Sequence, residues 1–494
     1  MNRKEAIIGN LLFHPKDIVF VTVFMGFLLS GKKMLSLDSD IGRHLILGDY
    51  ILTNLSIPTD NILSSTLAGL PRPPYEWLAQ ILFAFANRLL QIDGVITLAA
   101  TVVAFTFYLV FKRSNKLSGL PMTSLLLTVL GAIAASVHWL PRPHIWTFLF
   151  FAIWIEKLDL LERNEHEKIW TLPILMLLWV NLHGGFIFGF VAWFIYLIGN
   201  LFELVLQFDL SKRNVLIKLL VVGGASFAMT AISPSGLEIW SPAINASSKF
   251  ILANTLETQS PDFYLPQFWP FLLLTGCGLV LPGLGGRRLP ASQVFLLAGT
   301  AFLGFWMARN IPFFAIAAPP ILAIAAQPLV ERIRPLARIE INFRNVSNIA
   351  RGIFWPTIMI IGALTFFYFR EFQTGSGLNK FPENQLPVKA TDWLITHPIE
   401  GKMFNDINWG GYLLYRLWPK HKVFIDSQTD FYGEQLVHEY ASTISANLPW
   451  DDVFRKYQIQ WVMIRPDIPL HKELLSAGWE TLYKDNTAII LHIP

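Results

Sequence analysis

The first 371 residues are long apolar segments separated by short polar loops, and this pattern limits the fold more than any other feature of the chain. About 20 consecutive apolar residues form a helix that crosses a bilayer. Only 15% of the 494 residues are charged, whereas soluble domains carry about 25%. The pattern predicts an α-helical polytopic membrane protein. It argues against a disordered chain and a nucleic-acid-binding domain, and the single cysteine, Cys277, excludes a disulfide scaffold.

The apolar segments predict about eleven transmembrane helices. They lie at residues 17–34, 93–111, 121–139, 144–160, 169–183, 184–206, 214–232, 266–283, 291–307, 311–328 and 352–370. Residues 75–90 are apolar enough to form a twelfth span or to lie at the membrane surface. Lys and Arg favour cytoplasmic loops, and with eleven spans most of them fall on the N-terminal side. We therefore expect eleven spans in the plasma (inner) membrane, with a cytoplasmic N-terminus and an extracytoplasmic C-terminal domain.

After residue 371 the sequence has the charge density of a soluble domain, and it begins with a glycine-containing segment at 373–377. We expect a transmembrane domain at 1–371 and a small α/β domain at 372–494. Strands are expected at residues 402–404, 422–425, 458–464, 480–483 and 488–492, with helices at 387–396, 409–417, 433–444, 451–456 and 471–477. This alternation favours a small, partly parallel sheet with helices.

A long first outer loop, about residues 35–92, is the most informative segment. Residues 42–52 mix Leu, Ile and Tyr with Arg43, His44 and Asp49, which predicts an amphipathic helix on the membrane surface. Prolines then break the chain, and residues 75–90 predict a second, more apolar surface helix. Glu76 lies in its first turn, where the helix dipole favours a carboxylate.

Several short motifs resemble one family. They are Asp38-x-Asp40, Gly48-Asp49-Tyr50-Ile51-Leu52, Ile57-Pro58-x-Asp60 and Glu76-Trp77-Leu78 in the first loop, Ser233-Pro234-Ser235-Gly236, Ser260-Pro261-Asp262-Phe263 and Arg309-Asn310-Ile311-Pro312 in later outer loops, and Phe404-Asn405-x-x-x-Trp409-Gly410-Gly411 and Val423-Phe424-Ile425-Asp426-Ser427-Gln428 in the C-terminal domain. Together they are similar to a large bacterial branch of the GT-C superfamily of membrane glycosyltransferases, which is similar to polyprenyl-phosphate-sugar-dependent mannosyltransferases and arabinosyltransferases. The resemblance covers nearly the whole chain. The sequence departs from the pattern of the family at Gly42-Arg43 and Pro73-Pro74. These differences bear on the substrate more than on the fold.

The resemblance implies an inverting transfer of a sugar from a polyprenyl-phosphate carrier to an acceptor at the outer face of the membrane. A hydroxyl acceptor needs a general base, and the matching position is Asp40, followed by Asp38 and Glu76. The departing phosphate needs cations or hydrogen-bond donors. The candidates for substrate binding are Arg309, Arg142, His144, His183, His44 and Asp262.

The implied partners are a polyprenyl-phosphate-linked sugar donor, an acceptor that is a glycan, a lipid or a protein, and the lipid bilayer, with no nucleic acid. No cofactor is indicated. A requirement for a divalent metal ion stays an open question, although no set of ligands in the sequence points to one. The C-terminal domain is expected to recognise the acceptor or to shield the site.

Each of these residues also has a structural interpretation. Asp38 and Asp40 could cap a helix, Arg142 and Arg309 could extend from the membrane to the interface, and His183 could stabilise the turn between two spans. Two other functional classes also fit the sequence. One is a transporter or flippase for a lipid-linked saccharide, and the other is a non-catalytic membrane assembly protein for envelope glycans.

Overall fold

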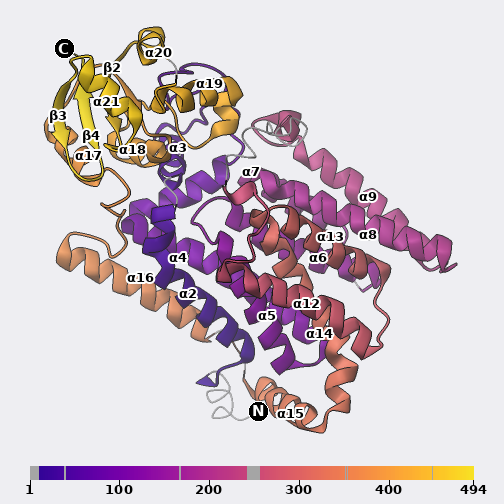
Figure 1. Ribbon diagram of the computed structural model, residues 1–494. Helices are drawn as coiled ribbons and strands as arrows, with labels where there is room; N and C mark the ends of the chain where they lie inside the picture. Colours follow the sequence, from indigo (N-terminus) through magenta and orange to yellow (C-terminus); the bar gives the residue numbers. More distant parts are fainter. Residues whose placement is uncertain are drawn as a thin grey trace.

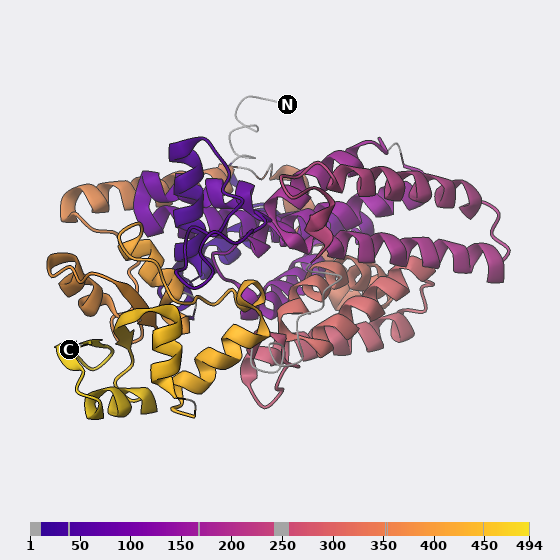
Figure 2. The same cartoon turned by 90° about the horizontal axis from the view of Figure 1, so that it is seen from above.

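The computed structural model describes residues 11–37, 40–165, 168–241, 256–350, 352, 354–447 and 449–493. A bundle of helices makes up most of the molecule, and the C-terminal domain lies against one end of it (Figure 1). Seen from above, that domain and the α8–α9 pair lie on opposite sides (Figure 2). The helices before the C-terminal domain are α2 (Pro15–Leu37), α3 (Ile41–Asn54), α4 (Trp77–Ser118), α5 (Pro121–Ala135), α6 (His144–Glu162), α7 (Thr171–Leu182), α8 (Ile187–Leu206), α9 (Lys212–Thr230), α12 (Trp269–Gly285), α13 (Ala291–Trp306), α14 (Ile311–Arg332), α15 (Arg334–Ile349) and α16 (Phe354–Thr374).

Helix α14 lies at the centre of the bundle. Its most apolar window is 83% buried, the largest share among the candidate membrane spans. Small residues allow its neighbours to approach closely: a Cβ on Gly131 of α5 would lie 2.6 Å from the carbonyl oxygen of Ala315. Close packing of this kind associates helices in lipid, where no hydrophobic force acts between them.

Seven helices in the described ranges are long and apolar enough to cross a membrane, and the bent pair α15–α16 raises the number to eight. A helix lies at each of the eleven expected positions, but α7 and α13 have only 12 and 16 residues. Helix α6 carries the charged residues Glu156, Lys157 and Asp159 in its second half. Charged side chains are costly in the hydrocarbon core of a membrane, so this half is poorly suited to cross it. The many-span architecture agrees with the expectation, and the count of eleven stays a prediction.

The first outer loop contains a helix at both expected positions, but the second is continuous with the following span. The first is α3. The second is the beginning of α4, which extends from Trp77 to Ser118 with a break at Leu90 and Gln91, where φ of Gln91 is +49°. The helix is kinked there, and its two parts lie so close together that a Cβ on Gly94 would lie 2.3 Å from the carbonyl oxygen of Ala86.

The C-terminal domain contains a four-stranded mixed sheet in the order β1-β2-β4-β3. Strands β1 (Lys402–Asn405) and β2 (Ile459–Ile464) are parallel, whereas β4 (Ile489–His492) is antiparallel to both β2 and β3 (Glu480–Lys484). The small, partly parallel sheet was expected from the sequence. Its helices are α17 (Val388–Thr396), α18 (Gly410–Leu417), α19 (Thr429–Ile444), α20 (Trp450–Tyr457) and α21 (Pro469–Ser476). The boundary at residue 371 stays a prediction.

One expected strand is wrong. Residues 422–425 do not join the sheet; instead, Val423 forms a single bridge with Ser64 of the first outer loop. Its backbone N–H donates to Leu63 and its carbonyl accepts from Ser65, at 3.2 and 2.8 Å. The apolar segment 423–425 is buried, but its backbone partner comes from the first outer loop and not from the sheet.

Helix α3 connects the first outer loop to the C-terminal domain. It packs against α18 so closely that a Cβ on Gly42 would lie 2.1 Å from the carbonyl oxygen of Gly411. On another face it packs against α4, where a Cβ on Gly48 would lie 2.0 Å from the carbonyl oxygen of Gln80. Any larger side chain at Gly42 or Gly48 would separate these helices, so both glycines fix the position of the residues that α3 carries.

Candidate functional site

Two cavities lie side by side where α3, the segment before α4 and the C-terminal domain meet. The larger has a volume of about 480 Å³ and the smaller about 370 Å³. They share a wall that consists of Arg43, His44, Glu76, His183, Gly184 and Ile187. The larger cavity extends toward α6 and α14, whereas the smaller one extends toward Arg72, Gln428 and Asp430. Side chains on the shared wall therefore face both spaces.

The larger cavity combines cations with an aromatic surface. Arg142 follows α5, and Arg309 lies in the short turn before α14. A guanidinium nitrogen of Arg142 lies 3.3 Å from a carboxylate oxygen of Asp40, and the other lies 3.9 Å from Glu257. Three phenylalanines complete the apolar part of the lining: Phe148, Phe188 and Phe313. This composition suits a ligand that has both a negative charge and an apolar part.

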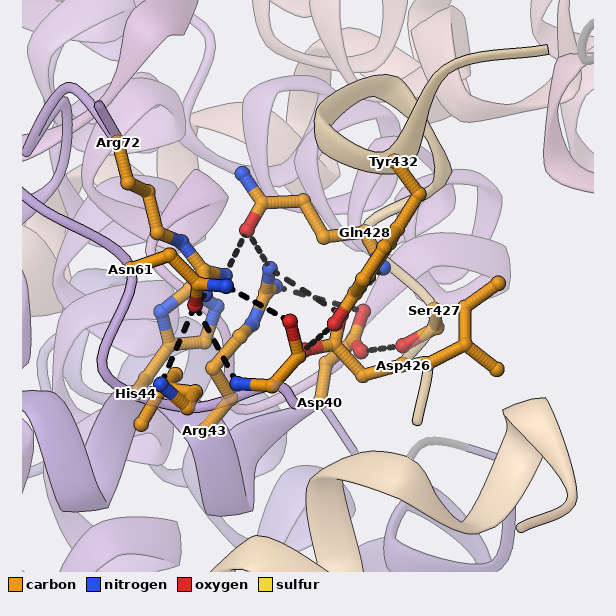
Figure 3. A network of polar contacts seen from close by, with 12 residues as sticks. Asp40, Arg43, His44, Asn61, Arg72, Asp426, Ser427, Gln428 and Tyr432 are labelled. Carbon is orange, nitrogen blue, oxygen red and sulfur yellow. Dashed lines mark hydrogen bonds and ion pairs between the residues drawn. The ribbon is translucent and has the colours of Figure 1, made fainter. Parts of the chain in front are cut away.

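Asp40 lies at the N-terminus of α3 but does not cap it. Its backbone is helical and its side chain makes no capping hydrogen bond. Instead, its carboxylate accepts a hydrogen bond from the hydroxyl of Ser427 in the C-terminal domain (Figure 3). Arg142 approaches the same carboxylate from the other side, and Arg43 lies 3.9 Å away. Asp40 thus joins the first outer loop, the helical bundle and the C-terminal domain.

Arg43 and Arg72 form a second group of charges on the side of the C-terminal domain. Both guanidinium groups donate to the side-chain oxygen of Gln428 (Figure 3). Arg43 also lies 3.9 Å from Asp426, whose carboxylate accepts from the backbone N–H of Gln428 and from the hydroxyl of Tyr432. Both arginines are buried. Because buried cations need partners, the segment 426–428 stabilises the charged floor of the smaller cavity.

Glu76 lies on the shared wall between two histidines. Its carboxylate oxygens are 3.6 Å from Nδ1 of His44 and 3.5 Å from Nε2 of His183. The start of α4 is held there because the indole N–H of Trp77 donates to Asn181 at the end of α7, at 2.8 Å. Burial raises the pKa of Glu76 to about 7, although the nearby Arg43 opposes this effect. Glu76 can therefore exchange a proton near neutral pH.

The protonation of His183 follows from its hydrogen bonds. Its Nδ1 accepts from the backbone N–H of Gly185 at 3.0 Å. The hydroxyl of Thr147 lies 2.8 Å from the same nitrogen and itself accepts from the indole N–H of Trp179, so its own hydrogen is directed to His183. The neutral ring then carries its hydrogen on Nε2, which faces Glu76. Burial lowers the pKa of His183 to about 3, which keeps the ring neutral.

Most of the residues proposed from the sequence lie together. Of the eight within the described ranges, seven line the larger cavity: Asp40, His44, Glu76, Arg142, His144, His183 and Arg309. Asp262 does not line either cavity; its carboxylate accepts from the backbone N–H of Tyr264 in an exposed turn. Asp38 lies outside the described residues. In the ranges that the structure describes, no group of three or more His, Cys, Asp or Glu side chains could hold a metal ion.

Other residues of the site were not proposed from the sequence. They are Arg43, Arg72, His138, Glu257, Ser427 and Gln428. Two of them, Ser427 and Gln428, are in the motif at 423–428 noted above, and Arg43 belongs to the pair Gly42-Arg43 at which the sequence departs from the family. Their convergence depends on contacts between the two ends of the chain, which local sequence patterns do not reveal.

No protein-family model matches this chain, and no curated protein does either. Among solved structures, the chain is similar to the oligosaccharyltransferase of Archaeoglobus fulgidus in the apo form, with a TM-score of 0.59 and 11% sequence identity over 90% of this chain and 69% of that one. The same enzyme tethered by a disulfide to an acceptor peptide with the NVT sequon gives a TM-score of 0.57 and 10% identity over 90% and 68%.

These similarities show the fold. The chain has the fold of that oligosaccharyltransferase, and its long apolar helices agree with the expected multi-pass membrane protein. Membership of the GT-C superfamily and of its bacterial branch stays a prediction.

Proposed function

We propose that this chain is a membrane glycosyltransferase of the GT-C type that transfers a sugar from a polyprenyl-phosphate carrier to an acceptor. The observation that carries the proposal is the larger cavity, whose lining includes Arg142, Arg309 and Glu76 together with three phenylalanines. The fold that this chain shares with the oligosaccharyltransferase of Archaeoglobus fulgidus supports it.

In this proposal Arg142 and Arg309 bind the carrier phosphate, and the phenylalanines contact the first part of the polyprenyl chain. Charge develops on the phosphate as it leaves, and fixed cations stabilise that charge most effectively when water is excluded. Arg142 is held in place by Asp40 and Glu257. The sugar then extends from the phosphate toward the shared wall.

Glu76 is the general base in this proposal. It faces both cavities, and its pKa of about 7 suits a base that works near neutral pH. Asp40, the first candidate from the sequence, already accepts from Ser427 and pairs with Arg142, so its contacts favour a positioning role. Glu76 takes the proton of the acceptor hydroxyl, whose oxygen bonds to the anomeric carbon while the bond from that carbon to the phosphate oxygen breaks.

The smaller cavity gives the acceptor a place on the opposite side of Glu76, between the first outer loop and the C-terminal domain. Its lining includes Tyr75, Asp60 and Asp430, which offer hydrogen bonds to a polyhydroxylated or peptide acceptor. The class of acceptor — glycan, lipid or protein — is left to the assay. We further propose that this side of the chain is extracytoplasmic in the plasma membrane, as the distribution of Lys and Arg predicts.

The test is an assay of the purified full chain with radiolabelled polyprenyl-phosphate sugars and a membrane extract as the source of acceptors. We expect consumption of the labelled donor and transfer of the label to one fraction of the extract. The matched control is the double variant R142A/R309A, which should bind and consume no donor. A donor that binds but is never consumed would favour the flippase or assembly function, and failure of any polyprenyl-phosphate sugar to bind would overturn the proposal.

A further inference from the structure

Helix α15 has features that neither the cavities nor the bundle requires. It lies at the end of the bundle far from the C-terminal domain (Figure 1), and its axis makes an angle of 69° with that of α16. Helix α16 has 21 residues, which gives a length of about 31 Å, close to the thickness of the hydrocarbon core. If α16 crosses the membrane, α15 must lie near the membrane plane.

The two faces of α15 differ in character. Leu336, Ile339, Phe343 and Val346 follow one another at intervals of three and four residues, which places them on one face of a helix. Three of these side chains are at least 40% exposed: Leu336, Ile339 and Val346. Arg334, Arg338 and Asn345 lie on the other side of the helix, which also carries the exposed Ile341. An apolar stripe of this kind beside basic residues is typical of helices that lie in a membrane interface.

Two polar contacts fix the rotation of α15 about its axis. The carboxylate of Glu340 is buried and accepts from the backbone N–H groups of Met122 and Thr123 at 2.9 and 2.7 Å, at the N-terminus of α5. The guanidinium of Arg344 donates to the carbonyl of Gly119 at 2.7 Å, at the end of α4. These contacts hold the helix against the bundle along one edge, so the apolar stripe cannot turn inward.

The basic side chains are available for binding. Arg332 at the end of α14 and Arg334 and Arg338 of α15 are exposed, and within the part of the chain that the structure describes they form no ion pair with a carboxylate. Three exposed arginines beside an apolar stripe match a surface of anionic headgroups over hydrocarbon, because each cation near such a surface adds to the attraction. A groove for a partner protein is not needed to explain either feature.

We propose that α15 is an interfacial helix that binds anionic phospholipids in the leaflet on the side away from the C-terminal domain. The stripe Leu336, Ile339, Phe343 and Val346 enters the acyl boundary, and Arg332, Arg334 and Arg338 bind the headgroup phosphates. This inference does not depend on the proposed glycosyl transfer.

The depth of the helix can be measured with spin labels. Cys277 is the only cysteine, so a C277S background permits single labels at V346C on the stripe and at N345C on the polar face. The full chain is placed in vesicles of phosphatidylcholine and phosphatidylglycerol. We expect the label at position 346 to collide with oxygen and to be shielded from an aqueous nickel chelate, and the label at 345 to show the opposite behaviour. Equal access of the chelate to both labels would overturn the proposal.

The lipid specificity needs a second experiment. The variant R332Q/R334Q/R338Q is compared with K422Q/K472Q/K484Q, which removes the same charge from exposed positions of the C-terminal domain. We measure the phosphatidylglycerol that remains bound to the purified protein, relative to phosphatidylcholine. Each arginine near the headgroups should contribute about fivefold, so the first variant should lose at least tenfold and the second should match the parent. Equal retention in all three proteins, or equal loss in both variants, would refute headgroup binding by α15.

Discussion

The hydroxyl of Ser427 donates a hydrogen bond to the carboxylate of Asp40, and this contact joins the C-terminal domain to the beginning of α3. The two residues are 387 positions apart in the sequence. Close to them, Gln428 accepts from Arg43 and Arg72. The C-terminal domain is therefore part of the wall of the site and not an appendage to it.

Removing this hydroxyl should loosen the C-terminal domain. A hydrogen bond to a charged group contributes about 1.5–3 kcal/mol, so we expect S427A to lower the unfolding temperature measurably and S427T to restore most of it. The control is S476A, which removes an exposed hydroxyl that bonds only within its own helix. The role assigned to Ser427 is wrong if both alanine variants unfold at the temperature of the parent.

Much of the site was predictable because topology alone brings outer loops together. Asp40 and Glu76 belong to the first outer loop and Arg142, His183 and Arg309 to later turns, but the expected order of spans puts all of these segments on one side of the membrane. Their meeting in one cavity follows from that order. Hydropathy and the distribution of charge were enough to place these segments on one side, whereas the choice of the catalytic candidates came from the resemblance.

The remaining residues depend on tertiary contacts that no local pattern encodes. The segment 422–425 has the composition of a strand, and only the folded chain reveals that it pairs with residues 63–65. That pairing brings Ser427 and Gln428 to the cavities. Likewise, Arg43 looked like the polar face of a surface helix, but α3 is covered on two sides by α4 and α18, so Arg43 is buried.

The rate of sugar transfer should rise with pH through about 7. A general base acts only when it is deprotonated, and burial raises the pKa of Glu76 to about 7. Below that pH Glu76 is protonated and the rate falls. E76Q should lower turnover by about 10²–10⁴-fold and remove this rise, as measured from pH 5.5 to 8.5 with a verified donor.

The parallel variant D40N decides between the two carboxylates. If Asp40 has the positioning role, D40N should raise the KM for the donor, because Arg142 loses a partner, while the rise of the rate with pH remains. The opposite pattern, in which E76Q keeps its pH profile and D40N loses it, would make Asp40 the base.

Arg309 should affect donor binding and turnover together. It lines the larger cavity from the turn before α14, and the carrier phosphate is charged both in the ground state and in the transition state. R309A should therefore weaken donor binding and lower kcat/KM. R309K should restore only part of the loss. The planar guanidinium can donate two parallel hydrogen bonds to a phosphate, whereas the ammonium of lysine acts as a point charge. Binding of a labelled donor to R309A at the parent's affinity would contradict this role.

Reporter fusions can test the orientation of the chain. The distribution of Lys and Arg predicts that the loop after Lys116 is cytoplasmic and that residues from Gly377 onward are extracytoplasmic. Fusions of a compartment-sensitive reporter after these two residues should give opposite signals. A cytoplasmic signal at Gly377 would remove the expected eleven spans and place both cavities on the wrong side for an extracytoplasmic reaction.

Asp93 should hold the linker to the C-terminal domain in place. It is buried just after the break in α4, and its carboxylate accepts from the backbone N–H groups of Leu378 and Asn379 at 2.6 and 2.9 Å and from the side-chain amide of Asn379 at 2.6 Å. D93A would leave these donors without an acceptor, at a cost of at least about 3 kcal/mol. We expect a lower unfolding temperature and faster proteolysis between residues 373 and 380, and D467A, an exposed control, should change neither. D93N should restore part of the loss, because its carbonyl oxygen still accepts from Asn379 while its NH2 group faces the N–H of Leu378. Unchanged proteolysis in D93A would show that the packing of α3 against α18 positions the domain without this linker.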